Sequence, residues 1–232
     1  MDRKSILAIV PAKGASTRLP RKNIRELAGK PLLGWTLDSA LASRVFADIV
    51  VSSEDEEVLS VASRWDVETR ERPHKLAVDP AGCIHVAQHV VAELEGKGRS
   101  YTHIAILMPT CPFRSVEDIC AAVAELNQGS AGVVISVSEF SHTPFNGFTL
   151  EAEGNLSPIT PAMFGCKTQE LPAVYRPNGA IFIMARDTLM ASSHLYPEPM
   201  RPVIMPEHRS VDIDNELDLQ WAAFLLDHGV IN

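Results

Sequence analysis

The sequence predicts an α/β fold in which a mostly parallel sheet is covered by helices on both faces. Short apolar runs alternate with segments of helical spacing along the chain, which is the pattern of repeated β-α units. The apolar runs are nearly continuous, as in strands that are buried on both faces. A length of 232 residues suits one domain. We therefore predict a single domain over residues 1–232.

The individual elements follow from the spacing of the apolar residues. In the segment 31–42, Leu33, Leu37 and Leu41 lie four residues apart and so share one face of a helix. Ser53, with Glu56 three residues later, is typical of a capping box and predicts the start of the next helix. Strands are expected at residues 6–10, 49–51, 104–108, 133–137, 179–184 and 203–205, with a short one near 67, and helices at 31–42, 53–64, 84–94, 116–126 and 216–226.

Residues 139–175 break this alternation. Prolines, glycines and polar residues dominate the segment, and it is too short to be a full domain. Segments of this kind often build interfaces. We therefore predict that residues 139–175 are an excursion inserted in the domain.

Composition and charge argue against several classes of protein. No run of about 18 apolar residues is present, so no transmembrane helix is expected, and the N-terminus lacks a signal-peptide pattern. The formal net charge of −8 argues against general nucleic-acid binding. The four cysteines form no Cys-x-x-Cys pair, which disfavours a zinc or redox site and favours free thiols in a reducing cytoplasm. We expect a cytoplasmic protein without membrane or nucleic-acid partners.

A basic loop follows the first predicted strand. Six of the 21 basic residues lie between Lys13 and Lys30, with Glu26 the single acid among them. Ligands of open α/β sheets bind at the carboxyl ends of the strands, where this loop lies. Backbone N–H groups around Gly14 and Ser16 would face phosphate oxygens, and the cations would neutralise a transferring phosphoryl group. The loop lacks the Walker A and dinucleotide-binding spacings, and a solvated basic loop is the alternative.

Asp212 and Asp214 form a second candidate site. Residues two apart in an extended segment point to the same side. Two such carboxylates make a hard oxygen site, which suits Mg²⁺ shared with the phosphates of a nucleotide. The alternative is structural, because Asp214 or Asn215 would serve as the cap of the helix that follows.

Arg176 and Asn178, just before a predicted strand, form a third candidate site. The arginine fork suits a carboxylate or phosphate, and the asparagine amide suits a sugar hydroxyl. A tight turn is the alternative, because Pro-Asn-Gly is an ordinary turn sequence. His85 and His89 lie four apart on a predicted helix, but a surface position is commoner for such histidines than a metal site.

Six segments spread over the chain form a pattern together. They are Lys13 to Asn23, Arg72-Pro73, Pro109-Thr110-Cys111-Pro112-Phe113-Arg114, Gln169-Glu170-Leu171-Pro172, Arg176-Pro177-Asn178-Gly179-Ala180-Ile181 and Asp212-Ile213-Asp214-x-Glu216-Leu217-Asp218. These segments resemble motifs of the acylneuraminate cytidylyltransferases, the family of the CMP-sialic acid synthetases that includes enzymes of the CMP-legionaminic acid type. The opening loop is also shared with 3-deoxy-octulosonate cytidylyltransferases and more distant sugar nucleotidyltransferases.

The resemblance implies a three-layer Rossmann-like nucleotidyltransferase fold and a reaction. The enzyme would transfer CMP from CTP to the anomeric hydroxyl of a sialic-acid-like nonulosonic acid and release pyrophosphate, with Mg²⁺, or Mn²⁺ as the alternative, as its metal. Residues 139–175 would form a homodimer and reach into the site of the partner. The alternatives are a cytidylyltransferase for another sugar acid, such as 3-deoxy-octulosonate, and a non-catalytic sugar-nucleotide-binding protein.

The resemblance also implies roles for individual residues. Catalysis would rest on Lys13, Lys22, Asp212 and Asp214, of which the two aspartates would hold the metal. The nucleotide would contact Ala12, Lys13, Gly14, Ser16, Arg18, Lys22, Asn23, Arg72 and Ala81. The acceptor sugar would contact Met108, Thr110, Lys167, Gln169, Arg176 and Asn178, with Lys167 or Gln169 serving the neighbouring subunit.

Some positions depart from the family pattern. Met108 stands where sialic acid enzymes commonly have a glutamine, and a thioether cannot replace the hydrogen bonds of an amide. Cys111 replaces the usual serine, and Phe182 replaces a common tyrosine. Most departures lie on the acceptor side, so they leave nucleotidyl transfer intact. They favour a relative of sialic acid with different substituents, such as a legionaminic-type sugar.

Overall fold

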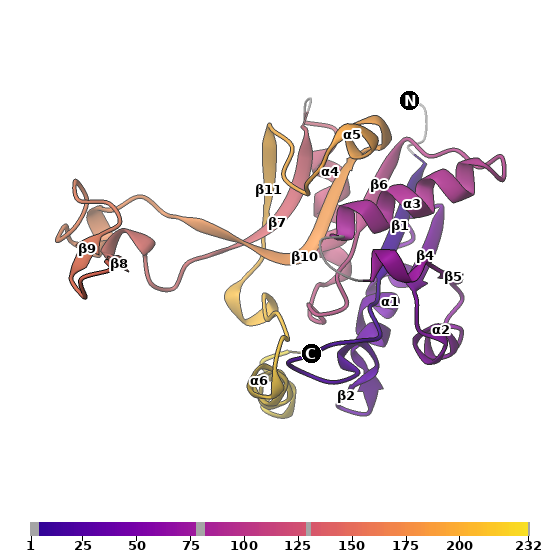
Figure 1. Ribbon diagram of the computed structural model, residues 1–232, viewed down its shortest axis with the longest axis horizontal. Helices are drawn as coiled ribbons and strands as arrows, with labels where there is room; N and C mark the ends of the chain where they lie inside the picture. Colours follow the sequence, from indigo (N-terminus) through magenta and orange to yellow (C-terminus); the bar gives the residue numbers. More distant parts are fainter. Residues whose placement is uncertain (1–4, 78–81, 129–130, 232) are drawn as a thin grey trace.

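Seven strands form the central sheet in the part of the chain that the structure, a computed structural model, describes: residues 5–77, 82–128 and 131–231. Their order is β11-β7-β10-β6-β1-β4-β5 (Figure 1). β10 runs antiparallel to both of its neighbours and the other pairs are parallel, which confirms the predicted sheet. The strands are β1 (Ile6–Pro11), β4 (Asp48–Ser53), β5 (Glu68–Glu71), β6 (His103–Ile106), β7 (Val133–Glu139), β10 (Tyr175–Ala185) and β11 (Met200–Ile204).

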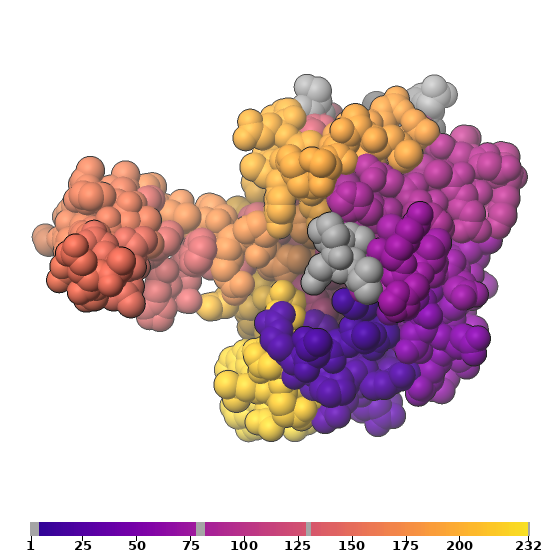
Figure 2. Space-filling view, in the orientation of Figure 1, coloured from indigo at the N-terminus to yellow at the C-terminus, as the bar shows by residue number. Residues whose placement is uncertain are grey.

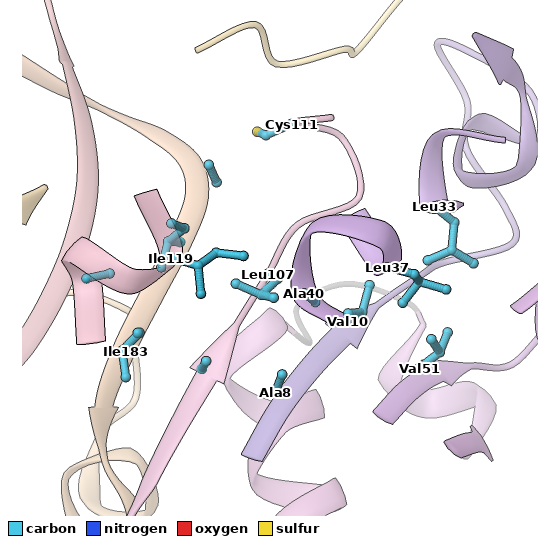
Figure 3. Close-up of a cluster of buried hydrophobic side chains, with 14 of the residues drawn as sticks. Ala8, Val10, Leu33, Leu37, Ala40, Val51, Leu107, Cys111, Ile119 and Ile183 are labelled. Carbon is cyan, nitrogen blue, oxygen red and sulfur yellow. The ribbon is translucent and has the colours of Figure 1, made fainter. Parts of the chain in front are cut away.

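Helices cover both faces of the sheet because its central strands are apolar on both sides. Ala8 and Val10 pack with α1, α2 and α4 in one buried cluster (Figure 3), whereas Leu7 and Ile9 pack with α3 and α5 in another. Successive side chains of a strand point to opposite faces, so one apolar run supplies both layers. The helices are α1 (Leu32–Ser43), α2 (Glu56–Ala62), α3 (Cys83–Glu95), α4 (Val116–Glu125), α5 (Arg186–Ala191) and α6 (Glu216–Asp227). Within the described ranges, no helix has the length and apolar character needed to cross a membrane.

The predicted helices and strands are all present, with ends shifted by a few residues. α5 and two short hairpins lie outside the prediction, because each is shorter than the window in which a helical or strand period shows. The hairpins pair β2 (Glu26–Leu27) with β3 (Lys30–Pro31) and β8 (Phe148–Leu150) with β9 (Leu156–Pro158).

The predicted start of α2 at Ser53 is wrong. Ser53 is the last residue of β4, where it pairs with Glu71 of β5. The cap is Asp55, whose carboxylate accepts hydrogen bonds from the backbone N–H groups of Glu57 at 2.9 Å and Val58 at 3.1 Å. At α6 the cap is Asn215, one of the two predicted candidates, and its amide oxygen accepts from the second and third N–H groups of the helix. Asp214 is therefore not needed as a cap.

The chain leaves the sheet between β7 and β10, in the region where the sequence predicts an insertion. The connecting segment, residues 140–174, stands out from the rest of the molecule as a protrusion (Figures 1 and 2) and carries the β8–β9 hairpin. Phe148 and Phe164 contact each other there, with ring centroids 5.0 Å apart. Several large apolar side chains of the protrusion are exposed: Phe140, Phe148, Leu150, Leu156, Ile159 and Phe164. An isolated two-stranded hairpin is marginally stable at best in water, so this surface is a candidate for contact with another chain.

Candidate active site

The basic loop lines a pocket at the carboxyl end of β1. β1 lies between β4 and β6 in parallel register, so the segments that follow these three strands emerge at the same edge of the sheet. The pocket has a volume of about 280 Å³. Its lining residues are Pro11, Lys13, Ala15, Ser16, Thr17, Arg18, Lys22, Asn23, Cys83, Met108, Pro109 and Thr110.

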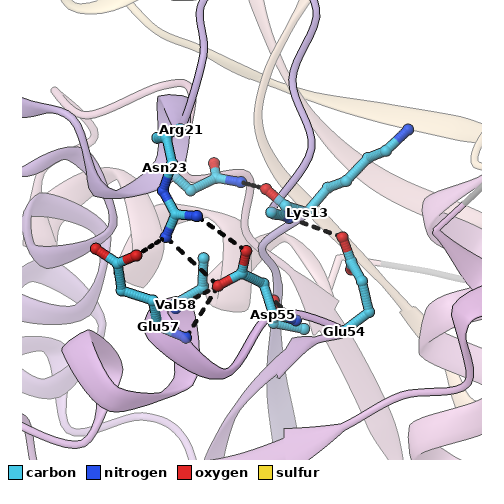
Figure 4. A network of polar contacts seen from close by, with 9 residues as sticks. Lys13, Arg21, Asn23, Glu54, Asp55, Glu57 and Val58 are labelled. Carbon is cyan, nitrogen blue, oxygen red and sulfur yellow. Dashed lines mark hydrogen bonds and ion pairs between the residues drawn. The ribbon is translucent and has the colours of Figure 1, made fainter.

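A network of hydrogen bonds and ion pairs holds the basic loop in place (Figure 4). The side-chain amide of Asn23 donates to the carbonyl oxygen of Lys13 at 2.7 Å, while the Lys13 side chain points away from the network (Figure 4). The backbone N–H of Gly14 donates to Glu54 Oε1 at 2.8 Å, so this N–H does not face a phosphate as the sequence suggested. A Cβ on Gly14 would lie 2.4 Å from Asp55 Cβ, and only glycine allows this approach.

The loop reaches the predicted aspartates through its cations. Lys22 Nζ lies 2.8 Å from Asp214 Oδ1, and Arg18 Nη2 lies 2.8 Å from Asp214 Oδ2. Partial burial raises the pKa of Asp214, but the hydrogen bond and charge of Lys22, together with Arg18, lower it overall. Lys22 and Asp214 are 192 positions apart in the chain, and the fold places opposite charges of both segments at one site.

Asp212 lies beside Asp214 in a different electrostatic setting. Desolvation and the negative charge of Asp214 raise its pKa, against hydrogen bonding from Thr110 and the charge of Lys22. The thiol of Cys111 lies 3.8 Å from Asp212 Oδ1. The backbone also joins the two segments, because the N–H of Ile213 donates to the carbonyl oxygen of Thr110 at 2.8 Å. The segment after β6 therefore holds the aspartate pair at the edge of the pocket.

The third candidate segment lies inside a strand instead of before one. Arg176 is half-buried in β10, where it pairs with Ser138 of β7, and the strand register shifts between Pro177 and Phe182. Gly179 has a φ of 76°, in the region that favours glycine. The predicted turn is thus a local irregularity in a long antiparallel strand.

Asn178 is 2% exposed and its amide bonds to the protein. Its oxygen accepts from Ser136 Oγ at 2.6 Å and from the N–H of Ala180 at 3.1 Å, and its nitrogen donates to Ser210 Oγ at 2.9 Å. These bonds tie β10 to β7 and to the segment that leads to Asp212. A sugar hydroxyl would have to displace one of them, so Asn178 organises the surroundings of the site in this structure.

The remaining predicted acceptor residues are divided between two places. Met108 and Thr110 line the pocket, where Met108 Sδ lies 3.7 Å from Cys83 Sγ. Lys167 and Gln169 are exposed on the protrusion, and neither lines the pocket of their own chain. Of the nucleotide residues, Arg72 is buried beside Glu54, and Ala81 lies outside the described residues.

The sequence reasoning missed two charged side chains that contact the pocket-forming segments from behind, Glu54 and Arg114. Glu54 directly follows β4 at the same edge of the sheet as the basic loop, a position that would have identified it. Arg114 is 3% exposed and donates to the carbonyl oxygens of Ala180 and Met108 and to the hydroxyl of Thr36. It therefore links β10, α1 and the pocket wall. Nothing in the sequence around Arg114 indicated that this arginine would be buried.

Comparison with known proteins places this arrangement in a family. Residues 7–146, more than half of the chain, match the family model described as Cytidylyltransferase. The chain belongs to the cytidylyltransferase family. This cytidylyltransferase is 33% identical over 222 residues to the CMP-N,N'-diacetyllegionaminic acid synthase of Legionella pneumophila, with 94% of this chain and 93% of that protein covered.

Two further curated relatives of this cytidylyltransferase are also named as cytidylyltransferases. The pseudaminic acid cytidylyltransferase of Campylobacter jejuni is 27% identical, with 94% of this chain and 95% of that protein covered. The N-acylneuraminate cytidylyltransferase of Escherichia coli is 30% identical, with 95% of this chain but 52% of that longer protein covered.

Solved structures confirm the fold of this cytidylyltransferase. A CMP:2-keto-3-deoxy-manno-octonic acid synthetase complexed with CTP aligns with a TM-score of 0.72 at 15% identity, covering 97% of this chain and 99% of that one. The 4-diphosphocytidyl-2C-methyl-D-erythritol synthase of Anaerococcus prevotii aligns with a TM-score of 0.69 at 15% identity, covering 97% of each chain. At this identity the likeness concerns the fold, and it confirms the predicted Rossmann-like nucleotidyltransferase architecture.

Proposed function

We propose that this cytidylyltransferase transfers CMP from CTP to the anomeric hydroxyl of a nonulosonic acid and releases pyrophosphate. The observation that carries the proposal is the contact of Lys22 and Arg18, which line the pocket, with Asp214. It brings cations suited to phosphates and a carboxylate suited to a metal ion together at one place. The relatives named for legionaminic, pseudaminic and neuraminic acids support a nonulosonic acid as the acceptor.

The reaction needs positioning and neutralisation of charge more than a protein nucleophile. The oxygen of the sugar hydroxyl forms a bond to the α-phosphorus of CTP, its proton is lost, and the bond to the pyrophosphate oxygen breaks. Lys13, Arg18 and Lys22 would neutralise the phosphates, because all three line the pocket. Arg72 and the backbone near Ala81 would contact the cytosine, and Met108, Thr110 and Arg176 the acceptor.

The aspartate pair fits a Mg²⁺ ion by the chemistry of its donors. Asp212 and Asp214 supply carboxylate oxygens close enough for the charge of one to raise the pKa of the other, and a divalent cation between them would relieve that repulsion. No cluster of three or more metal-ligating side chains occurs in the described part of the chain, and Mg²⁺ commonly completes its shell with substrate phosphates and water. When bound, the ion would stabilise charge on the phosphates.

The proposal extends to a homodimer built by the protrusion and located in the cytoplasm. The exposed apolar side chains of residues 139–175 support the interface, and Lys167 or Gln169 would then serve the partner's site. Sedimentation should give about twice the chain mass of 25.3 kDa. Replacing Leu150, which is 72% exposed on the hairpin, by aspartate should give monomers, because a charge cannot be buried without a partner.

Leu217→Asp is the matched control for this change. Leu217 is 73% exposed on α6, outside the protrusion, so its replacement should leave the dimer intact. A wild-type protein that is a stable, active monomer would contradict the proposed interface.

Release of pyrophosphate tests the proposed reaction. CTP, UTP, GTP and ATP are paired in the presence of Mg²⁺ with sialic, legionaminic, pseudaminic and 3-deoxy-octulosonic acids. We expect release only with CTP and a nonulosonic acid. Preference for 3-deoxy-octulosonic acid would instead favour the other sugar acid, and CTP binding without release from any pair would favour a binding protein.

A further inference from the structure

One largely buried carboxylate contacts both the loop that lines the pocket and a buried arginine that does not itself line it. Glu54 follows β4, and its Oε1 atom accepts the N–H of Gly14 at 2.8 Å, as Figure 4 shows from the side of the loop. Its other oxygen, Oε2, accepts from Arg72 Nη2 at 2.8 Å. The Glu54 side chain is 11% exposed and that of Arg72 is 3% exposed. Glu54 is absent from the residues that line the pocket, so it acts from behind the wall.

The hydrogen bond to Gly14 fixes the loop side of the pocket. Gly14 lies between Lys13 and Ala15, which both line the pocket. The loop rests directly on the Glu54–Asp55 turn, where a Cβ on Gly14 would collide with Asp55. Because the backbone is fixed at Gly14, the neighbouring backbone N–H groups and the Cα atom of Lys13 are held in place at the pocket.

The ion pair with Arg72 fixes a second side. Arg72 Nη1 also donates to the carbonyl oxygen of Ser52 at 3.2 Å, so the guanidinium is held against the end of β4. Arg72 lies close to Cys83: burial raises the pKa of the Cys83 thiol, and the positive charge of Arg72 acts in the opposite direction. Cys83 begins α3 and lines the pocket together with residues of the loop.

The contacts of Glu54 favour its ionised form. Burial by itself raises its pKa, but backbone hydrogen bonds, including that of Gly14, and the charge of Arg72 lower the pKa overall. Separating the two partners of this ion pair would leave an uncompensated charge out of water, so the pair resists separation. One carboxylate thus holds the basic loop and the arginine at a fixed separation.

We propose that Glu54 is a positioning residue for the nucleotide, setting the distance between the phosphate-binding loop and the Arg72–Cys83 side of the pocket. The inference rests on the proposed function and adds to it a residue that does not touch the ligand. Because the same wall geometry serves bound CTP and the transition state, Glu54 affects the binding of CTP more than the rate of the bound complex.

Glu54→Gln tests this role, because it keeps the shape of the side chain and removes its charge. We expect the Kd for CTP, measured by calorimetry, and the KM for CTP to rise roughly tenfold, the scale of one lost hydrogen bond to a charged group. The kcat should change less than about threefold, and the KM of the acceptor should stay unchanged. Glu57→Gln is the matched control, because Glu57 lies three residues further on, in the first turn of α2, but is exposed and pairs with Arg21; its CTP affinity should equal that of the wild type.

Glu54→Asp is the second variant if Glu54→Gln folds poorly. It keeps the negative charge beside Arg72 but shortens the side chain by one methylene, so one carboxylate no longer spans Gly14 and Arg72, and its CTP affinity should also be lowered. A folded Glu54→Gln protein with a lower Tm but unchanged Kd and KM for CTP would overturn the inference. A wild-type protein that binds no CTP would overturn the proposed function, and this inference with it.

Discussion

Asp212→Asn should lower kcat by about 10²–10³-fold, which is the scale for removing one group that stabilises transition-state charge. The change keeps the size of the side chain but removes one of two carboxylates that would hold Mg²⁺. The rate of pyrophosphate release, measured over a range of Mg²⁺ concentrations, checks this prediction. The Mg²⁺ concentration that gives half of the maximal rate should be higher in the variant. Activity near that of the wild type would remove Asp212 from the metal site.

The folded state should survive this substitution. In the native protein, desolvation and the charge of Asp214 disfavour the ionised form of Asp212, so a neutral amide at this position removes an unfavourable interaction. The Tm should be unchanged or slightly higher. Asp227→Asn is the matched control, because Asp227 is an exposed carboxylate at the far end of α6, and it should leave both Tm and kcat unchanged.

Lys22→Met is expected to have the second large effect, with a loss of about 10²-fold in kcat/KM for CTP. Methionine keeps an unbranched side chain of similar length but removes the ammonium that pairs with Asp214 and lines the pocket. Both the phosphates and the leaving pyrophosphate then lose a neutralising charge. Initial rates over a range of CTP concentrations would separate the change in KM from the change in kcat.

Arg25→Met is the control for Lys22→Met. Arg25 belongs to the same basic stretch, but it does not line the pocket and its guanidinium pairs with Glu216 at 3.1 Å in an exposed position. Its replacement should cost less than about threefold in kcat/KM, since exposed ion pairs contribute little. Equal losses in the two variants would show that the general positive charge of the loop, and not Lys22 itself, is what matters.

Sequence reasoning predicted the α/β alternation because the apolar period of each element is written within a few consecutive residues. β1 shows this clearly, since Leu7 and Ile9 alternate with Ala8 and Val10 and so supply both faces. The start of α2 was misplaced by the same kind of local reasoning. Ser53 and Asp55 are both good caps, and the pairing of Ser53 with β5 decides between them.

In the candidate site, too, the sequence indicated some features, whereas others depend on contacts between distant segments. The basic loop and the two aspartates were visible as unusual local groups of charge, and the structure brings Lys22 and Asp214 together. The assignment of Asn178 to a sugar hydroxyl could not foresee that Ser136 and Ser210, distant in the chain, occupy its amide. The same holds for Glu54, whose partners Gly14 and Arg72 come from different strand ends.

The sequence by itself determined the fold class, the family motifs and the chemical types of group at the site. The tertiary structure decided which of those groups touch each other: Lys22 and Arg18 with Asp214, Glu54 with Gly14, and the amide of Asn178 with other strands. The physical reason is the distance along the chain between the residues that interact. A hydrophobic period depends on neighbouring residues, whereas a hydrogen bond between Gly14 and Glu54, 40 residues apart, depends on how the intervening chain packs the strands side by side.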